Sequence, residues 1–303
     1  MAARTGWREK WRARFPQAKF DEPLSRHTTF HIGGPGDCYL EVGNPDDLRD
    51  SAALAAEQEL PVFFLGQGSN LLVLDRGIRG VVVRLKGAFD AIETLDHGRV
   101  RAGAGARVPK LASFCAQKGL AGLEPLIGVP GTVGGALVMN AGTPDGEIGP
   151  WVAEVEIWNA EKRCRRVLPR GELRFGYRSS NLGGRIILGC VLQLNAGDKV
   201  DIMKRVRSYQ RRRLQTQPIH TYNVGSVFKN PPGRFVARLV EEAGLKGRAV
   251  GGARVSPKHA NFIENFSGAT ARDVLELIEL IRQKVRETFA VELELEVKVV
   301  GEA

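Results

Sequence analysis

The sequence predicts an α+β protein in which two small α/β subdomains precede a C-terminal α+β domain. In residues 22–85, and again in residues 86–214, short runs typical of β-strands alternate with a helical stretch. The last third ends instead in a long amphipathic helix followed by one alternating strand. A chain of 303 residues also exceeds the usual single-core domain. We therefore expect an N-terminal extension (1–21), two subdomains (22–85 and 86–214) and a C-terminal domain (215–303).

The first subdomain is expected to contain a helix at 45–58 and strands at 38–42, 61–65 and 80–84. The second of these strands leads into the loop Gly66-Gln67-Gly68-Ser69-Asn70, which has little side-chain bulk. Such a loop can bring several backbone N–H groups onto phosphate oxygens. It lacks the third glycine of a dinucleotide fingerprint and the lysine of a Walker loop, so an ordinary strand-ending turn is the alternative.

The second subdomain is expected to contain helices at 109–118 and 201–214 and strands at 91–95, 99–102, 152–158 and 185–194. Its central segment, Gly128–Gly142, is dense in glycine and conflicts with both helix and strand propensity. A backbone so constrained usually lies beside a ligand, and the alternative is a tight corner at a domain junction. Two loops suited to phosphate in adjacent subdomains imply a ligand that spans both.

The C-terminal domain carries the clearest local signals. Thr270 and Asp273 have the spacing of a capping box, which predicts the start of a helix. From there, apolar residues recur at helical spacing and form one apolar face: Val274, Leu277, Ile278, Ile281, Val285 and Phe289. Over residues 291–299, apolar residues alternate with glutamate and lysine, which is the pattern of a half-buried strand.

Charge and composition disfavour several classes of protein. The net charge of +10 would suit nucleic acid, but equally a substrate that carries phosphates and a carboxylate. No zinc-finger, RRM or KH signature is present, so we expect no nucleic-acid partner. The 4 cysteines form no C-x-x-C pair and the 5 histidines have no metal spacing, which predicts no metal site. Since membrane-length apolar runs and a secretory signal are also absent, we expect a cytoplasmic protein that does not enter membranes. We also expect a monomer, although no sequence feature reveals the oligomeric state.

Three polar motifs could carry chemistry. Arg178, after Tyr177, could bind a carboxylate through two parallel hydrogen bonds, or it could be a surface cation packed on a ring. Ser226, in Gly225–Pro232, could donate a proton, or it could stabilise a turn together with Asn230. It does not lie in a nucleophile elbow. Periodicity gives no reason to distinguish Glu296 from its neighbours in an amphipathic strand.

Taken in order, these segments resemble the UDP-N-acetylenolpyruvoylglucosamine reductase (MurB) family over residues 24–301. The motifs that carry the resemblance are Thr28–Pro35, Gly66–Leu72, Gly128–Gly142, Tyr177-Arg178, Gly225–Pro231, Ala243–Gly247 and Leu293–Gly301. The path from Asn230 to Glu241 is too short for the long tyrosine-bearing substrate loop of one branch. The chain therefore resembles the shorter, type II form.

The resemblance implies an FAD-binding fold of the vanillyl alcohol oxidase / PCMH type, followed by a domain that binds a UDP-sugar. It also implies a reaction in which NADPH reduces non-covalently bound FAD. The flavin then reduces the enolpyruvyl group of UDP-N-acetylglucosamine enolpyruvate to a lactyl ether, which gives UDP-N-acetylmuramate for peptidoglycan synthesis.

Residue roles follow from the same resemblance. Arg178 would clamp the substrate carboxylate, Glu296 would help to stabilise the enolic intermediate and Ser226 would protonate the carbon. Tyr177, Arg213, Lys229, Asn230 and His259 would contact the substrate. The residues expected to bind FAD are Gly66, Gln67, Gly68, Ser69, Asn70, Leu71, Gly128, Pro130, Gly131, Thr132, Gly134, Gly135, Asn140 and Gly142.

The chain departs from the family pattern at two places. Leu295 stands where proline is common, which puts the entry into the final strand in doubt, and Arg26-His27 stands where asparagine is frequent. An FAD-dependent oxidase of sugars or alcohols with the same fold is the alternative function, with Cys38 or His31 as imaginable covalent attachment points. A basic protein that binds nucleic acid or UDP-sugars without catalysis is a second alternative.

Overall fold

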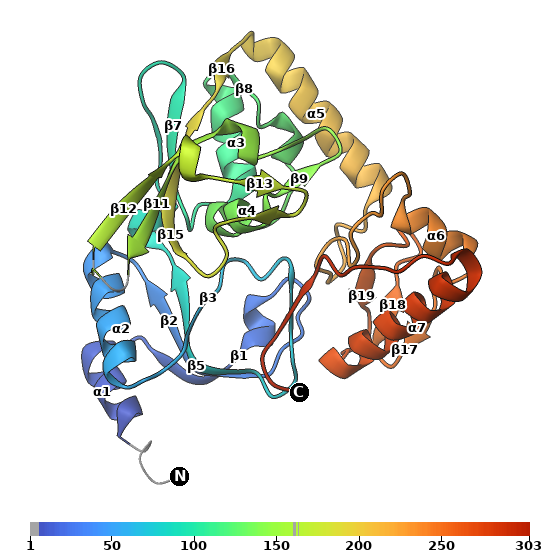
Figure 1. The fold of residues 1–303 in the computed structure, drawn as a ribbon, viewed down its shortest axis with the longest axis horizontal. Helices are drawn as coiled ribbons and strands as arrows, with labels where there is room; N and C mark the ends of the chain where they lie inside the picture. The colour runs from blue at the N-terminus through green and yellow to red at the C-terminus, as the bar shows by residue number, and fades with distance from the viewer. Residues whose placement is uncertain (1–5, 160–161, 163) are drawn as a thin grey trace. The chain divides into compact units, whose positions relative to one another are not determined.

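The computed structural model describes residues 6–159, 162 and 164–303. These residues form two compact units, through which the chain passes several times (Figure 1). Unit 1 comprises the described residues of Met1–Ala18, Tyr39–Gly66 and Val81–Arg212, and unit 2 comprises Lys19–Cys38, Gln67–Gly80 and Arg213–Ala303. Two segments from the N-terminal part of the chain, Lys19–Cys38 and Gln67–Gly80, therefore belong to the same compact unit as the C-terminal residues. The three-part functional division expected from the sequence stays a prediction.

The α-helices of the described residues are α1 (Trp7–Arg14), α2 (Pro45–Glu57), α3 (Val108–Gln117), α4 (Val133–Met139), α5 (Lys199–Thr216), α6 (Val236–Glu242) and α7 (Ala271–Phe289). Short 3₁₀ helices are η1 (Leu24–His27), η2 (Gly87–Asp90), η3 (Glu124–Leu126), η4 (Gly149–Trp151) and η5 (Arg170–Glu172). None of the helices in this part of the chain has the length and apolarity needed to cross a bilayer.

The strands of the first 160 residues are β1 (Lys19–Pro23), β2 (Pro35–Val42), β3 (Val62–Phe64), β4 (Leu71–Val73), β5 (Ile78–Leu85), β6 (Ile92–Thr94), β7 (Arg99–Gly103), β8 (Leu120–Ala121), β9 (Gly142–Thr143), β10 (Gly146–Glu147) and β11 (Val152–Asn159). Those that follow are β12 (Cys164–Pro169), β13 (Phe175–Gly176), β14 (Ser179–Ser180), β15 (Ile186–Gln193), β16 (Asn195–Ala196), β17 (Ala249–Val250), β18 (Ala253–Val255), β19 (Ile263–Asn265) and β20 (Lys298–Val300).

An antiparallel sheet in the order β12-β11-β15-β7-β6 forms the centre of unit 1. The strands predicted at 91–95, 99–102, 152–158 and 185–194 are all confirmed, because each has an apolar face or run to bury. The edge strand β12 was not predicted. Its sequence, Cys-Arg-Arg-Val-Leu-Pro, is mostly exposed, and charged residues on an edge strand prevent pairing with another chain.

Helix α4 corrects the expectation that Gly128–Gly142 lacks regular structure. Thr132 caps its N-terminus by accepting a hydrogen bond from the N–H of Gly135 at 3.4 Å, and Asn140 ends it in a left-handed conformation. The helix packs against β7 and β15, so tertiary contacts override the poor helix propensity of its two glycines.

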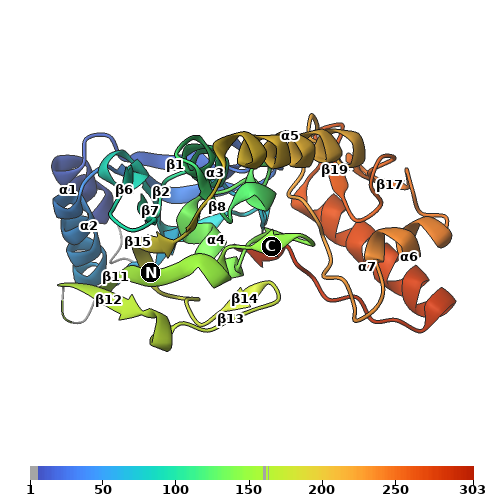
Figure 2. The same cartoon turned by 90° about the horizontal axis from the view of Figure 1, so that it is seen from above.

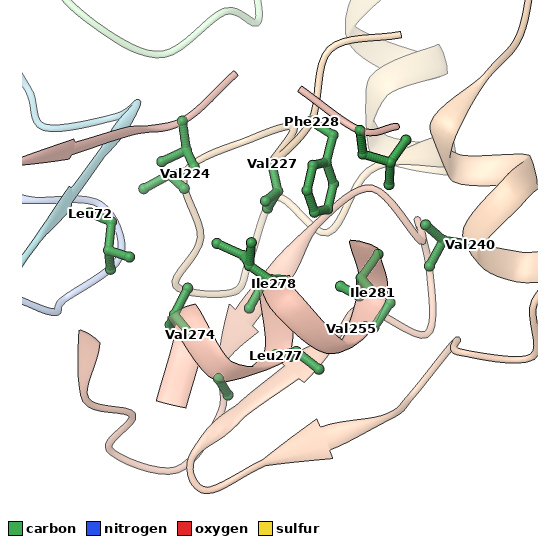
Figure 3. Close-up of a cluster of buried hydrophobic side chains, with 14 of the residues drawn as sticks. Leu72, Val224, Val227, Phe228, Val240, Val255, Val274, Leu277, Ile278 and Ile281 are labelled. Carbon is green, nitrogen blue, oxygen red and sulfur yellow. The ribbon is translucent and has the colours of Figure 1, made fainter. Parts of the chain in front are cut away.

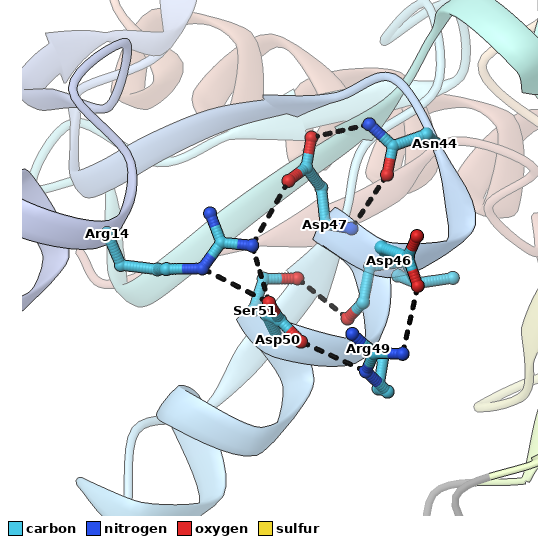
Figure 4. Close-up of polar contacts among 8 residues, drawn as sticks. Arg14, Asn44, Asp46, Asp47, Arg49, Asp50 and Ser51 are labelled. Carbon is cyan, nitrogen blue, oxygen red and sulfur yellow. Dashed lines mark hydrogen bonds and ion pairs between the residues drawn. The ribbon is translucent and has the colours of Figure 1, made fainter.

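Helix α1 and the residues directly after it pack on α2. Trp11 and Phe15 of the α1 region are almost fully buried. Arg14 binds Asp50, with donor–acceptor distances of 3.1 and 2.5 Å, and reaches Asp47 at 3.4 Å (Figure 4). The hydrogen bond from Arg14 lowers the pKa of the Asp50 carboxyl. Both charges are largely solvated, so the buried aromatic rings contribute more to this docking than the ion pairs.

The core of unit 2 surrounds the apolar face of α7. Leu277, Ile278 and Ile281 pack with Phe228 and with other apolar residues of the C-terminal segment (Figure 3). Phe30, Ile32 and Leu72 come from the two N-terminal segments and join the same cluster. Each such side chain contributes about 1.5–3 kcal/mol when it is removed from water. Burial of these three side chains explains why the N-terminal segments belong to this unit.

The strand predicted over 291–299 is wrong in its extent, because β20 covers only Lys298–Val300. The alternating burial is present, with Leu293 and Val297 buried. However, the segment pairs with two partners: Leu295 bridges Phe228, whereas β20 runs parallel to β4. A change of partner interrupts the ladder that a single strand would need.

We expect Asp273→Ala to lower the free energy of unfolding by about 0.5–2 kcal/mol at neutral pH, because it removes the carboxylate half of the capping box that starts α7. Asp273 accepts hydrogen bonds from the N–H of Thr270 at 3.0 Å and of Gly252 at 3.3 Å. The bond from Thr270 is the largest cause of the lowered pKa of Asp273. A carboxyl whose pKa is lower in the folded state stabilises above its unfolded pKa, and this stabilisation is lost as the pH falls through the folded pKa.

Urea unfolding of the wild type and the variant at about pH 7 and about pH 3 checks this expectation. The difference between the two proteins should shrink at the lower pH. Glu276→Ala is the control, since Glu276 lies in the same helix but makes only an exposed pair with Arg272. An equal deficit at both pH values would mean that the carboxylate is not the source of the stabilisation.

Candidate active site

The two loops predicted to hold phosphate meet in unit 1. Gly66 follows β3, which pairs in parallel with β5, and it lies directly against Thr132 at the start of α4. A Cβ atom at Gly66 would lie 2.6 Å from the Thr132 Oγ1 atom, so only glycine allows this approach. The backbone of the two loops is therefore in close contact here, with few side chains between them. A surface of this kind fits the diphosphate of FAD, which binds backbone N–H groups.

The first N–H groups of α4 are already bound by protein atoms. Val133 donates to the carbonyl of Ala106 at 2.8 Å, and Gly134 donates to that of Ala104 at 2.9 Å. Gly135 donates to the side chain of its N-cap residue. The helix start therefore offers these amides to the protein and not to a phosphate. Among the predicted FAD residues of the segment, Pro130 and Gly135 are exposed, and three glycines are half-buried: Gly128, Gly134 and Gly142.

Asn140 and Gly142 have structural explanations. Asn140 is fully buried, and its amide accepts a hydrogen bond from Gly149 and donates one to Gly176, both at 2.9 Å. A Cβ atom at Gly142 would lie 2.6 Å from that of Glu147 across the β9–β10 pair. Contacts within the protein account for both residues, and a direct cofactor contact by either one stays a prediction.

Arg178 lies at the tip of the β13–β14 hairpin in unit 1. The two strands pair antiparallel, with Tyr177 and Arg178 as the connecting residues. Arg178 has a φ of 52°, which is uncommon for a residue other than glycine, and its guanidinium lies 5.0 Å from the centre of the Tyr177 ring. The arginine is half-buried and Tyr177 is exposed. An arginine in a strained conformation on a defined turn is consistent with a functional role.

Unit 2 brings Ser226, Glu296 and the second half of the first loop together. The backbone N–H of Glu296 donates to the carbonyl of Val227 at 2.8 Å, and Asn70 donates from its amide to the carbonyl of Glu296 at 3.1 Å. The bridge between Phe228 and Leu295 makes this pairing antiparallel. The side chains of Ser226 and Glu296 are both half-buried. Two predicted catalytic residues, 70 positions apart in the sequence, thus lie on paired segments beside the predicted FAD loop.

The remaining FAD residues of this loop belong to unit 2. Gly68 has a φ of 63°, and a Cβ atom there would lie 2.6 Å from the carbonyl oxygen of His27. Gln67 and Ser69 are half-buried, and Leu71 opens β4, which pairs with β20. The conformation of Gly68 lets the chain turn between Gly66 and the strand that begins at Leu71.

The predicted substrate residues have less uniform surroundings. Lys229 forms an ion pair with Glu294, and Asn230 accepts a hydrogen bond from the N–H of Val236 at 3.0 Å. Arg213 lies near the end of α5, and burial lowers the pKa of its guanidinium. Burial also lowers the pKa of His259, whose ring meets the edge of Phe262 at 4.7 Å between centres. Since Phe262 also bridges Ser226, the structure brings His259 close to the predicted proton donor.

Sequence reasoning missed two asparagines that hold the Ser226 segment. Asn261 accepts a hydrogen bond from the N–H of Phe228 at 3.0 Å and donates to its carbonyl at 2.8 Å. Asn223 accepts from the N–H of Gly225 at 3.0 Å. An asparagine two residues before a glycine is a recognisable turn signal, which could have revealed Asn223. Asn261 has no local signal, because its partner is 33 residues away.

Two features bear on the alternatives and on metal binding. Cys38 is fully buried, whereas His31 is exposed and stacked on Tyr222 at 3.9 Å between ring centres. With a φ of 54°, His31 is, like Arg178, one of several described residues other than glycine that adopt the left-handed conformation. Within residues 6–159, 162 and 164–303, no cluster of histidine, cysteine, aspartate and glutamate could hold a metal ion.

Comparison with known families gives two matches. Residues 217–300 match the model of the UDP-N-acetylenolpyruvoylglucosamine reductase C-terminal domain, and residues 36–167 match an FAD binding domain. These matches confirm the predicted fold class and FAD as the cofactor. The FAD domain model covers the two loops that meet at Gly66 and Thr132.

Relatives match over nearly the whole chain. UDP-N-acetylenolpyruvoylglucosamine reductase 2 of Symbiobacterium thermophilum is 48% identical over 282 residues, which cover 92% of this chain and 91% of the relative. The reductase of Rubrobacter xylanophilus is 45% identical, with 95% and 97% covered. The crystal structure of the reductase from Thermus caldophilus superposes with a TM-score of 0.79 at 39% identity, covering 93% of this chain and 98% of that one. The chain therefore belongs to the UDP-N-acetylenolpyruvoylglucosamine reductase family, and it is an oxidoreductase.

Proposed function

We propose that this chain uses electrons from NADPH to reduce the enolpyruvyl group of UDP-N-acetylglucosamine enolpyruvate, with Arg178, Ser226 and Glu296 as its catalytic residues. The observation that carries the proposal is the pairing of Val227 with Glu296 beside Asn70. This pairing places a hydroxyl-bearing segment and a carboxylate-bearing segment next to a loop of the FAD domain. The family relationship supports the substrate and the electron donor.

When bound and reduced by NADPH, FAD would supply the hydride that is added to the methylene carbon of the substrate. A proton must then reach the neighbouring carbon, so that the double bond becomes the saturated lactyl ether. The product keeps both its carboxylate and its ether oxygen. The residues of the chain therefore have three tasks, which are to orient the enolpyruvyl group, to stabilise the charge that develops and to deliver one proton.

Ser226 is the proposed proton donor. A serine hydroxyl is a weak acid, so its effect depends on precise placement. Its neighbour Val227 donates to the carbonyl of Asn261 at 2.9 Å and accepts from the N–H of Glu296 at 2.8 Å. The backbone after Ser226 is thereby held on both sides. Such a frame keeps the hydroxyl in one position while the negative charge forms.

Arg178 and Glu296 are the proposed electrostatic residues. The charge that forms beside the methylene carbon spreads into the substrate carboxylate. A planar guanidinium binds a carboxylate through two hydrogen bonds, which favours Arg178 over a lysine in this role. Glu296 is proposed to assist at the enolic oxygen. Its backbone position is fixed by its bond to Val227 and by the bond from Asn70.

The substrate carries a diphosphate, and the net charge of +10 supports its attraction to the protein. We assign its contacts to Arg213, Lys229, Asn230 and His259, with Tyr177 beside the carboxylate clamp. We further propose residues 215–303 as the UDP-sugar domain, since the family model for that domain spans 217–300. A cytoplasmic location also belongs to the proposal, because NADPH and UDP-linked sugars are used inside the cell. The short path from Asn230 to Glu241 supports the type II form, and a monomer completes the proposal.

An anaerobic experiment on the purified holoenzyme tests this function. We expect NADPH to bleach the flavin absorbance, and UDP-N-acetylglucosamine enolpyruvate to restore it with formation of UDP-N-acetylmuramate. UDP-N-acetylglucosamine, which lacks the enolpyruvyl group, is the control and should leave the flavin reduced. If oxygen alone restores the oxidised flavin, the oxidase alternative replaces this proposal.

A further inference from the structure

The β13–β14 hairpin holds Arg178 in a conformation that it would not adopt by itself. The left-handed region costs an ordinary residue about 1–2 kcal/mol. A strained residue keeps its conformation only when its surroundings fix it. The hairpin is short: Phe175 pairs with Ser180 and Gly176 with Ser179, and Asn181 donates to the carbonyl of Arg174 at 3.1 Å at its base. A two-stranded hairpin by itself is only marginally stable, so its tip needs further support.

Two side-chain bonds join this hairpin to the C-terminal end of α4, which contacts β14 (Figure 2). The amide of Asn140 donates to the carbonyl of Gly176 at 2.9 Å. The hydroxyl of Ser180 donates to the carbonyl of Val138 at 2.9 Å. One of these bonds involves β13, through Gly176, and the other involves β14, through Ser180. Gly176 is separated from Arg178 by a single residue.

The other side of Asn140 is equally fixed. Its Oδ1 atom accepts a hydrogen bond from the N–H of Gly149 at 2.9 Å, and the residue has no exposed surface. A Cβ atom at Gly149 would lie 2.7 Å from both Asn140 and the ring of Phe175, so these three residues are in close contact. Arg170 closes the group by bonding the carbonyl of Gly149 at 2.9 Å and by stacking on Phe175 at 5.5 Å. The hairpin therefore rests on a tightly packed base.

We propose that Asn140 is a positioning residue, which fixes the turn that presents Arg178 to the substrate carboxylate. The proposal rests on the role assigned to Arg178 above. A helix end in the left-handed conformation usually carries glycine, which would serve as the cap alone. Glycine here would leave the Gly149 N–H and the Gly176 carbonyl without their partner. An asparagine satisfies the conformation and both groups at once.

Asn140→Asp is the sharpest test, because aspartate has nearly the same volume and tolerates the left-handed conformation. It keeps an acceptor for Gly149 but loses the donor to Gly176. We expect flavin reoxidation by the enolpyruvyl substrate to slow by about 10- to 100-fold and the substrate KM to rise, a much larger effect than any change in flavin reduction by NADPH. A purely structural role would instead lower flavin content and slow both half-reactions alike.

A double-mutant cycle distinguishes this inference from the proposed function. If Asn140 acts through Arg178, Asn140→Asp should change the reoxidation rate of Arg178→Ala by less than about twofold. If the fold-loss in the double variant instead equals the product of the fold-losses in the two single variants, the inference is overturned and the role of Arg178 stands. An Arg178→Ala enzyme that reoxidises at the normal rate would overturn both.

Asn261→Asp is the matched control, since Asn261 is also buried and also holds a backbone carbonyl. Its effect should multiply with that of Arg178→Ala, because it supports the Ser226 segment. Ser180→Ala covers the case in which Asn140→Asp does not fold, since it removes the second bond to α4 without burying a charge. It too should slow reoxidation alone and show no further effect in Arg178→Ala. A normal reoxidation rate in Ser180→Ala, with unfolded Asn140→Asp, would overturn the inference.

Discussion

Ser226→Ala is expected to slow reoxidation of the flavin by the enolpyruvyl substrate by about 10²- to 10⁴-fold, which is the usual contribution of a positioned proton donor. The substitution removes one hydroxyl from a half-buried site and leaves the backbone bonds of Val227 and Phe228 in place. Reduction of the flavin by NADPH needs no proton from this hydroxyl. Stopped-flow measurement of the two half-reactions under anaerobic conditions should therefore show a loss in the second one only.

The control for this prediction is Ser267→Ala, because Ser267 is an exposed serine of the same unit outside the predicted site. It should leave both half-reactions unchanged. A solvent deuterium effect on reoxidation should be present in the wild type and altered in Ser226→Ala, since the proton transfer that follows the hydride step makes that step irreversible. Equal damage to both half-reactions would remove Ser226 from the role of proton donor and indicate a part in flavin binding.

The elements that the sequence predicts well are those with strong local patterns. Helix α7 begins at the capping box of Thr270 and Asp273, and its buried face consists of the apolar residues that recur at helical spacing. Helices α2, α3 and α5 are confirmed within two residues at each end. Helix α4 was missed because its two glycines oppose a helix, and its stability comes from the sheet beneath it.

In the candidate site, too, features with a local sequence pattern can be predicted and features that depend on the tertiary fold cannot. The motifs predict which residues matter, yet no local pattern brings Ser226 beside Glu296, because the pairing depends on a bridge between Phe228 and Leu295. The bonds of Asn140 to Gly176 and of Asn261 to Phe228 span 36 and 33 residues. Side-chain bonds to distant backbone groups depend on the assembled fold. The residues that hold a site in place are therefore harder to predict than those that do the chemistry.

Arg178→Ala is expected to slow reoxidation by about 10²- to 10³-fold and to raise the substrate KM, because it removes the group that binds the developing charge. Arg178→Lys keeps the charge but loses the planar pair of donors, so we expect it to recover only part of the loss. Arg174→Ala is the control, since Arg174 is an exposed arginine at the base of the same hairpin. It should leave both half-reactions near normal.

Arg178→Gly separates the guanidinium from the strained backbone. At a φ of 52°, alanine keeps the strain and glycine relieves it, while both lack the charged group. Equal losses in the two variants would assign the effect to the guanidinium, and added guanidinium salt should then restore part of the reoxidation rate in Arg178→Gly. If glycine instead supported normal reoxidation, the position would matter only for the shape of the turn. The substrate carboxylate would then have to be bound by another cation.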